Sequence, residues 1–143
     1  MHRALSILPC LLALLLLMPA AHADRFEQHD DLEIHFNAMP TTRLSPEISE
    51  ARSIPRSRLQ GMVLISVLRD GESVPARLRG HVVDDAGDER DIQFREVREG
   101  DFVNTIGTFR INDLERLRFE LEVRPRDGDA RYPIRFSERF HVD

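Results

Sequence analysis

Leu117-Arg118-Phe119-Glu120-Leu121-Glu122-Val123 is the stretch of sequence that decides the fold. Apolar and charged residues alternate strictly along it, and successive side chains of a β-strand point to opposite faces of a sheet. The stretch therefore predicts a strand with one face in an apolar core and the other face in water. Phe119, at its centre, is expected to be a core residue.

Six further segments have strand-like apolar spacing and are separated by turn residues. The run over residues 62–68 is continuously apolar apart from one serine, which is typical of a central strand covered on both faces. We expect Leu64 in this run, and Phe136 near the end of the chain, to belong to the core. The six segments cover residues 32–36, 62–68, 78–82, 92–94, 102–109 and 134–140.

One segment departs from the strand pattern and predicts a short helix over residues 46–51. Ser45 is a favourable N-cap residue, and Pro46 suits the first helical position because its missing N–H would be unpaired there anyway. Pro55 ends the helix within about two turns. The pattern as a whole predicts an all-β fold, a seven-stranded β-sandwich with one short helix.

The first 23 residues have the three parts of a secretory signal peptide. A short basic start is followed by an apolar run over residues 4–18 and then by the small residues of Ala21-His22-Ala23. An uncleaved membrane anchor is the alternative, but the run is shorter than the roughly 20 residues that span a bilayer. We expect a signal peptide over residues 1–23, a periplasmic protein in a Gram-negative host and no transmembrane segment in the mature chain.

Residues 24–143 are expected to form a single domain, because they are too few for two. The whole chain of 143 residues has 20 basic residues, all arginine, against 25 acidic ones, and residues 24–143 carry a net charge of −6. A surplus of negative charge does not suit binding to phosphates, so we expect no nucleic-acid partner. Cys10, the only cysteine, lies in the predicted signal peptide, which leaves the mature chain without a thiol.

The sequence offers no template for catalysis. It contains no Gly-x-Ser-x-Gly elbow, no Ser-x-x-Lys motif and no glycine-rich phosphate loop. We therefore expect no catalytic residues and no cofactor, and the sequence favours a protein that is not an enzyme.

Two groups of polar residues are candidate sites. His29, Asp31, Glu33 and His35 would share one face if they lay on a single strand, and imidazole and carboxylate are ligands for zinc, copper or nickel. The plainer interpretation is the polar outer face that the alternation with Leu32, Ile34 and Phe36 requires anyway.

The second candidate is a surface of paired charges near residue 97, which could recognise a partner. It could equally be the charged end of a strand, since exposed ion pairs contribute little. Its residues are Arg95, Glu96, Arg98 and Glu99.

Several stretches occur in an order that is similar to a known family. They are Phe36-Asn37-Ala38, Ser45-Pro46-Glu47, Ile65-Ser66-Val67-Leu68, residues 94–101 (FREVREGD), Thr108-Phe109 and residues 134–143 (IRFSERFHVD). Together they resemble the small exported bacterial proteins known as domain of unknown function 4426. The resemblance implies an exported domain with an immunoglobulin-like sandwich fold, and it implies no activity and no catalytic residues.

Two functions of different classes follow from these observations. The first is a protein-binding or envelope-assembly module without catalytic activity, since a sandwich leaves edge strands that can pair with a partner's strand. The alternative is a metal-binding protein or an enzyme that uses the face of His29, Asp31, Glu33 and His35.

The predicted signal peptide implies a defined cleavage site. We expect the exported chain to begin at Asp24, because Ala21 and Ala23 place small residues at the −3 and −1 positions of the cleavage site. N-terminal sequencing of protein from the envelope fraction checks this, and a chain that still begins at Met1 would contradict it.

Overall fold

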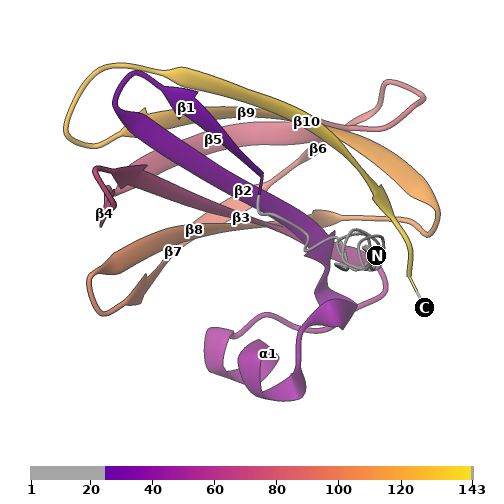
Figure 1. Cartoon of the computed structure of the whole chain (residues 1–143). Helices are drawn as coiled ribbons and strands as arrows, with labels where there is room; N and C mark the ends of the chain where they lie inside the picture. Colours follow the sequence, from indigo (N-terminus) through magenta and orange to yellow (C-terminus); the bar gives the residue numbers. More distant parts are fainter. Residues whose placement is uncertain (1–24, 143) are drawn as a thin grey trace, which may run out of the picture.

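The computed structural model describes residues 25–142, and the predicted signal peptide lies outside them. Two antiparallel sheets pack face to face (Figure 1). The larger, sheet A, has the strand order β1-β2-β3-β8-β7 with β4 paired to β3, and the smaller, sheet B, has the order β10-β9-β5-β6. No helix within residues 25–142 is both long and apolar enough to cross a membrane.

Ten strands are present instead of seven. The seven predicted segments correspond to β2, β3, β5, β7, β8, β9 and β10, and the additional strands β1, β4 and β6 have five, two and three residues. Strands this short carry too few residues to show a two-residue period in sequence. The ten are β1 (Arg25–His29), β2 (Leu32–Pro40), β3 (Gln60–Arg69), β4 (Glu72–Ser73), β5 (Ala76–Val83), β6 (Glu89–Asp91), β7 (Gln93–Glu99), β8 (Phe102–Arg110), β9 (Glu115–Pro125) and β10 (Tyr132–Phe140).

Aromatic contacts between the sheets form the centre of the core. Phe119 of β9 is fully buried, as predicted, and its ring stacks on that of Phe136 with centroids 4.4 Å apart. Phe109 of β8 meets Phe119 edge to face at 5.2 Å, and Phe36 of β2 stacks on Phe136 at 4.6 Å. Two of these rings come from each sheet, so the contacts tie the two layers together.

The predictions for the two other core residues need correction. Phe136 packs against the core but is only partly buried, because β10 is the edge strand of sheet B. Leu64 points away from the main core, since its neighbours Val63 and Ile65 occupy the inner face of central strand β3. It contacts a smaller apolar cluster on the outer face of sheet A, made of Ile54, Met62 and Ile106 with Met39, Leu44 and Val97.

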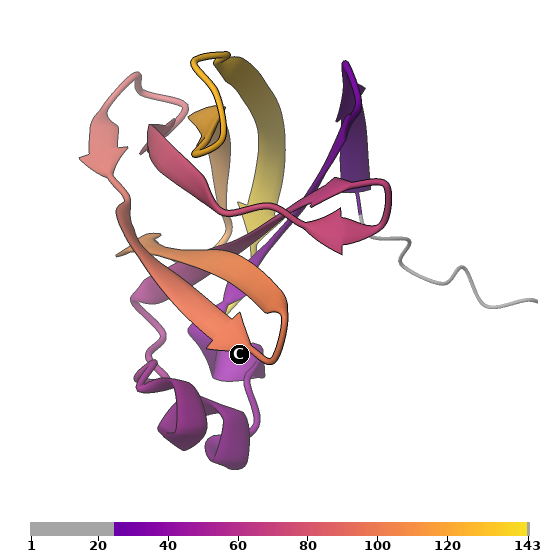
Figure 2. The ribbon, with the colours of Figure 1, turned by 90° about the vertical axis from the view of Figure 1, so that its left-hand side faces the viewer.

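The predicted helix is present as α1 (Pro46–Arg52), one residue longer than expected, and follows the 3₁₀ turn η2 (Thr41–Arg43). The Ser45 side chain accepts a hydrogen bond from the Ile48 N–H at 3.3 Å, as an N-cap does. Ser53 ends the helix in the left-handed conformation, with φ of 52°. The helix projects beyond one end of the sheets, and buried Ile54 anchors the segment to sheet A (Figures 1 and 2).

The chain passes from one sheet to the other between β6 and β7. Ile92 separates the two strands and is buried. Gly107 of β8 makes room for this crossing, because a Cβ atom there would lie 2.5 Å from the Ile92 side chain and 2.8 Å from the Phe94 ring. The continuous segment of residues 89–99 therefore forms one edge of both sheets.

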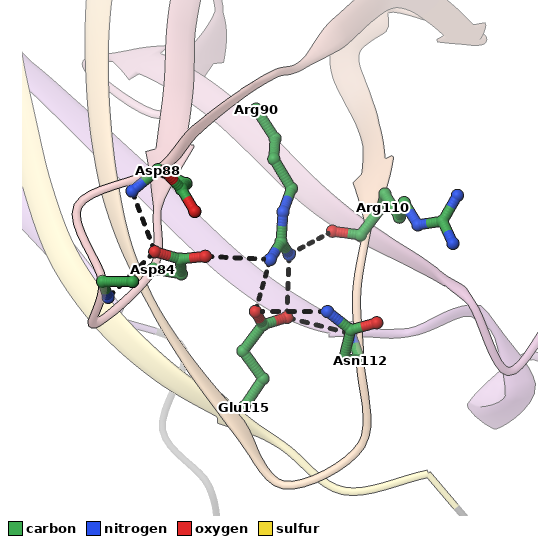
Figure 3. Close-up of polar contacts among 7 residues, drawn as sticks. Asp84, Asp88, Arg90, Arg110, Asn112 and Glu115 are labelled. Atoms are coloured by element: carbon green, nitrogen blue, oxygen red, sulfur yellow. Dashed lines mark hydrogen bonds and ion pairs between the residues drawn. The ribbon is translucent and has the colours of Figure 1, made fainter.

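An ion cluster centred on Arg90 fixes this crossing (Figure 3). The Arg90 guanidinium donates to both carboxylate oxygens of Glu115 at the start of β9, to Asp84 at 3.2 Å and to the Arg110 carbonyl at 3.1 Å. The side chains of Arg90, Asp84 and Glu115 retain 20%, 15% and 13% of their exposure, so solvent screens the pairs weakly. The cluster thus joins the β5–β6 turn to the ends of β8 and β9.

The fully buried Phe119 gives a prediction for stability. Phe119→Ala should lower the free energy of unfolding by about 3–5 kcal/mol, because it removes the central ring of the stack and leaves a cavity. Phe102→Ala is the matched control and should change it by less than about 0.5 kcal/mol, since Phe102 is 53% exposed. Urea unfolding of both variants checks this, and equal effects would show that the two rings are equally buried.

The Arg90 cluster predicts how the stability of the fold depends on pH. Hydrogen bonds from Arg90 hold the pKa of Glu115 below its ordinary value of 4.5. A lowered pKa in the folded state contributes stability above pH 4.5, and this contribution is lost as the pH falls through the folded-state value. Glu115→Gln should therefore cost about 1.5–3 kcal/mol at pH 7.

Thermal melts between pH 7 and pH 3 measure this difference. The gap in melting temperature between the parent protein and Glu115→Gln should narrow as the pH falls. The exposed residue Glu72 supplies the control Glu72→Gln, which should melt like the parent at every pH. A gap that stays constant down to pH 3 would show that the charge of Glu115 does not stabilise the fold.

Candidate functional site

The first group of predicted site residues lies on a hairpin, not on a single strand. The chain reverses at Asp30 and Asp31, where Asp30 has a positive φ of 52°, so that His29 of β1 pairs with Leu32 of β2. The expectation of one shared face is therefore wrong. Residues directly opposite in an antiparallel pair share a face, which places His29 with Leu32 on the inner side and His35 on the outer side.

His29 belongs to a cluster on the inner side of the hairpin, beside the start of β10. Its Nε2 lies 2.8 Å from a carboxylate oxygen of Glu27, and its ring is 5.3 Å from the ring of Tyr132. The Tyr132 hydroxyl donates to Asp30 at 2.8 Å, and this carboxylate raises the pKa of the phenol. These contacts attach the hairpin to sheet B.

His35 lies on the outer face of sheet A. Its Nε2 is 3.2 Å from Glu33, and its ring stacks on exposed Phe26 with centroids 5.2 Å apart. Ser66 is its neighbour on β3, but the Ser66 hydroxyl donates to Asn104 at 2.7 Å. Each histidine of the hairpin is therefore matched with one glutamate, and the two pairs lie on opposite faces.

Residues 25–142 contain no group of three or more histidine, cysteine, aspartate or glutamate side chains arranged to hold a metal ion. Asp31, the remaining member of the predicted group, is at the hairpin turn and accepts a hydrogen bond from Arg69 at 2.7 Å. The structure thus separates the four candidate ligands instead of bringing them together.

The second group of predicted residues lies on β7, the edge strand of sheet A, and also divides between two faces. Arg95 and Glu99 point toward α1, where Arg95 donates to the Arg52 carbonyl and Glu99 pairs with the Arg52 side chain. Glu96 lies on the other face and pairs with Arg126 at 2.7 Å. Arg98, on the same side as Glu96, has a side chain that is 63% exposed.

The backbone of β7 presents an open row of hydrogen-bonding groups. The N–H and C=O groups of Val103 on β8 are bonded to Ser73 of β4 and therefore point to the side of β8 where β3 lies. Backbone groups of successive residues in a strand point to opposite sides, so the groups of the even-numbered residues of β8 point toward β7. In the register of the pair, Arg95 faces Ile106 and is bonded to β8. The N–H and C=O groups of the alternate residues Phe94, Glu96 and Arg98 consequently point outward from the sheet.

The other long edge strand, β10, is blocked. Pro133 has no N–H to offer, and the Ser137 carbonyl accepts a hydrogen bond from Arg25 of β1 at 3.3 Å. Arg25 also pairs with Glu138 at 2.6 Å and lies over the Phe136 ring at 4.7 Å. Since β1 and β6 are only five and three residues long, β7 is the longest unblocked edge within residues 25–142.

The charged residues of β7 stand out in the sequence, but the open backbone edge of β7 and the roles of Arg25 and Arg90 do not. Arg25 and Arg90 resemble the other arginines in sequence, and their roles depend on partners 113 and 25 residues away. The one local signal is the Asp84–Asp88 turn, whose acidic residues precede Arg90 closely.

Several solved structures have a fold similar to that of this chain. A crystal structure of a DUF4426 family protein from Pseudomonas aeruginosa has a TM-score of 0.74 and 25% identity, over 84% of this chain and 96% of that one. A copper-bound variant of FetP from uropathogenic Escherichia coli strain F11 has a TM-score of 0.56 and 13% identity, over 84% and 95%. A structure of FetP from the same strain, as isolated after expression in the periplasm of E. coli, has a TM-score of 0.54 and 12% identity. The match covers 82% of this chain and 92% of that one.

The FetP structures are similar in fold alone. No curated protein matches the chain. The family model described as domain of unknown function (DUF4426) matches residues 26–143. This match covers nearly all of the predicted domain and agrees with the structure from P. aeruginosa, and the chain therefore belongs to the DUF4426 family.

Proposed function

We propose that the protein is a non-catalytic binding module of the periplasm, exported by a cleaved signal peptide, which takes up an extended segment of a partner protein along β7. The observation that carries the proposal is the open edge of this strand, with the N–H and C=O groups of Phe94, Glu96 and Arg98 directed outward. A partner strand added there would extend sheet A by one strand through main-chain hydrogen bonds.

The surroundings of β7 support this role. The contacts of Arg95 and Glu99 with Arg52 hold α1 against one face of the strand, and the Glu96–Arg126 pair holds the other. The Arg90 cluster fixes the chain just before the strand begins. A strand held in this way loses little conformational freedom when a partner binds, which favours affinity.

The charges on β7 also have a protective role. Edge strands commonly carry charged residues that prevent indiscriminate pairing with other chains. Arg95, Glu96, Arg98 and Glu99 alternate in sign along the strand, so a partner segment with the matching alternation would be accepted and a purely apolar strand disfavoured.

Metal binding is the second function to weigh, because the FetP variant of similar fold is copper-bound. The ligand types present, histidine and carboxylate, suit copper. Their arrangement does not fit, since His29 and His35 lie on opposite faces and each is paired with one glutamate. His141, a further candidate ligand, follows β10 and is exposed. The proposed function therefore includes no metal.

A proline substitution tests the open edge. Arg98→Pro removes an outward-facing N–H and should leave the β7–β8 hydrogen bonds in place, whereas Arg98→Gln removes the same charge and keeps the N–H. With a photo-crosslinking residue at Asp101, beside the end of β7, the parent protein and Arg98→Gln should yield the same crosslinked partner in the native envelope. Arg98→Pro should lose it.

The melting temperature of each variant serves as the folding control. Crosslinking that survives in a folded Arg98→Pro variant would exclude strand addition at β7. Loss in Arg98→Gln as well would show that the guanidinium, and not the backbone edge, is what the partner recognises.

Metal addition provides an independent prediction. Zinc, copper, nickel or EDTA should shift the melting temperature of tag-free protein by less than about 2 °C, because no assembled ligand set within residues 25–142 couples metal binding to folding. A shift of about 5 °C or more that disappears in a His29→Ala, His35→Ala double variant would support the metal-binding function instead.

A further inference from the structure

The outer face of sheet B is densely charged and has a different composition from the rest of the molecule. In an antiparallel sheet the residues that alternate with the buried ones point outward, and on β5, β9 and β10 these are mostly arginine. Eight arginines belong to this face: Arg77, Arg79, Arg116, Arg118, Arg124, Arg131, Arg135 and Arg139. All except Arg124 are exposed.

The positive charge of this face contrasts with an acidic remainder. Five carboxylates share the face with the eight arginines: Glu89, Asp91, Glu120, Glu122 and Asp129, which pairs with Arg124. The rest of residues 25–142 has eleven arginines and eighteen acidic residues. The molecule therefore has one positive side, and a negatively charged surface would attract it in one orientation.

Most of these arginines are free to bind an anion. Arg118 pairs with Glu120 at 3.1 Å, Arg124 with Asp129 at 3.1 Å and Arg131 with Glu122 at 3.6 Å. The other five form no ion pair with any carboxylate of the described residues. Two of these, Arg79 of β5 and Arg135 of β10, line a shallow depression on either side of β9, where they lie opposite Glu122 and Glu120 in the strand register. A guanidinium can donate two parallel hydrogen bonds to a phosphate group, so these side chains suit phosphate-bearing surfaces.

The composition of the face distinguishes a lipid surface from a protein partner. Stable protein interfaces have an apolar or aromatic centre surrounded by a polar rim. Among the exposed large apolar residues of the described chain, Phe26, Ile48, Leu59 and Phe102 lie on other elements. Leu114 lies at the border of sheet B, in the turn before β9, where its carbonyl accepts a hydrogen bond from Arg139 at 3.2 Å. The outward residues of sheet B are charged or small and polar apart from Pro133, half-buried His81 and buried Val83. A layer of phosphate headgroups needs no apolar anchor on the protein.

We propose that the protein docks on anionic phospholipid membranes through the arginine-rich outer face of sheet B. The binding is electrostatic and peripheral, and each arginine close to the headgroups contributes about a fivefold increase in membrane partitioning. This attraction decays within about 8 Å at physiological ionic strength. The proposal is independent of strand addition at β7, because β7 belongs to sheet A and sheet B lies on the other side of the core.

Co-sedimentation with vesicles tests the proposal. The exported chain is used after its N-terminus has been sequenced, since an uncleaved apolar leader would bind lipid by itself. The parent protein should bind phosphatidylglycerol vesicles at 50 mM salt, be released at 300 mM salt and not bind phosphatidylcholine vesicles. Arg79→Gln combined with Arg135→Gln should reduce partitioning by about tenfold or more.

A matched control separates this face from overall charge. Arg43→Gln with Arg56→Gln removes the same charge from exposed arginines outside both sheets and should leave binding within about twofold of the parent. Equal losses in the two double variants, or no binding to phosphatidylglycerol, would overturn the proposal. Binding to polyglutamate but not to vesicles would overturn it in favour of an acidic polypeptide partner.

Discussion

The packing of phenylalanine rings between the two sheets is the interaction on which the rest of the structure depends. Phe36 and Phe109 from sheet A meet Phe119, Phe136 and Phe140 from sheet B, with ring centroids between 4.4 and 6.2 Å apart. Burial of these rings provides a large share of the hydrophobic free energy of a domain with no cysteine in its described residues. It also determines which face of every strand is available for function.

The two sheets are packed together at their centre, and along two of the open sides between them an arginine side chain contacts residues of both sheets. Arg25 covers the side between β1 and β10 by pairing with Glu138 and lying over the Phe136 ring. Arg90 closes the side where β6 crosses to β7, through both oxygens of Glu115. In both places the planar guanidinium reaches several partners at once, which a lysine ammonium does less well. The edge of β7, which follows the Arg90 cluster along the chain, is left open, and we infer that this is where a partner binds.

The two proposed surfaces belong to different sheets and use different physical forces. Main-chain hydrogen bonds at β7 are short-ranged and directional, so they suit recognition of an extended segment. The arginines of sheet B act over several ångströms and suit attachment to a charged layer. A domain that uses both would hold its protein partner at the membrane surface, with the two sites separated by the aromatic core.

Sequence alone determined the fold class, because alternation along residues 117–123 and the other segments assigns most side chains to a buried or an exposed face. It also located α1, since the N-cap Ser45 and Pro46 act locally. What only the tertiary structure decided depends on contacts between distant residues. The turn at Asp30 sends His29 and His35 to opposite faces, the register of β8 leaves alternate groups of β7 free, and sheet pairing gathers arginines from β5, β9 and β10 on one face. A local pattern reports the periodicity of a strand but not its neighbours, and these sites are made by neighbours.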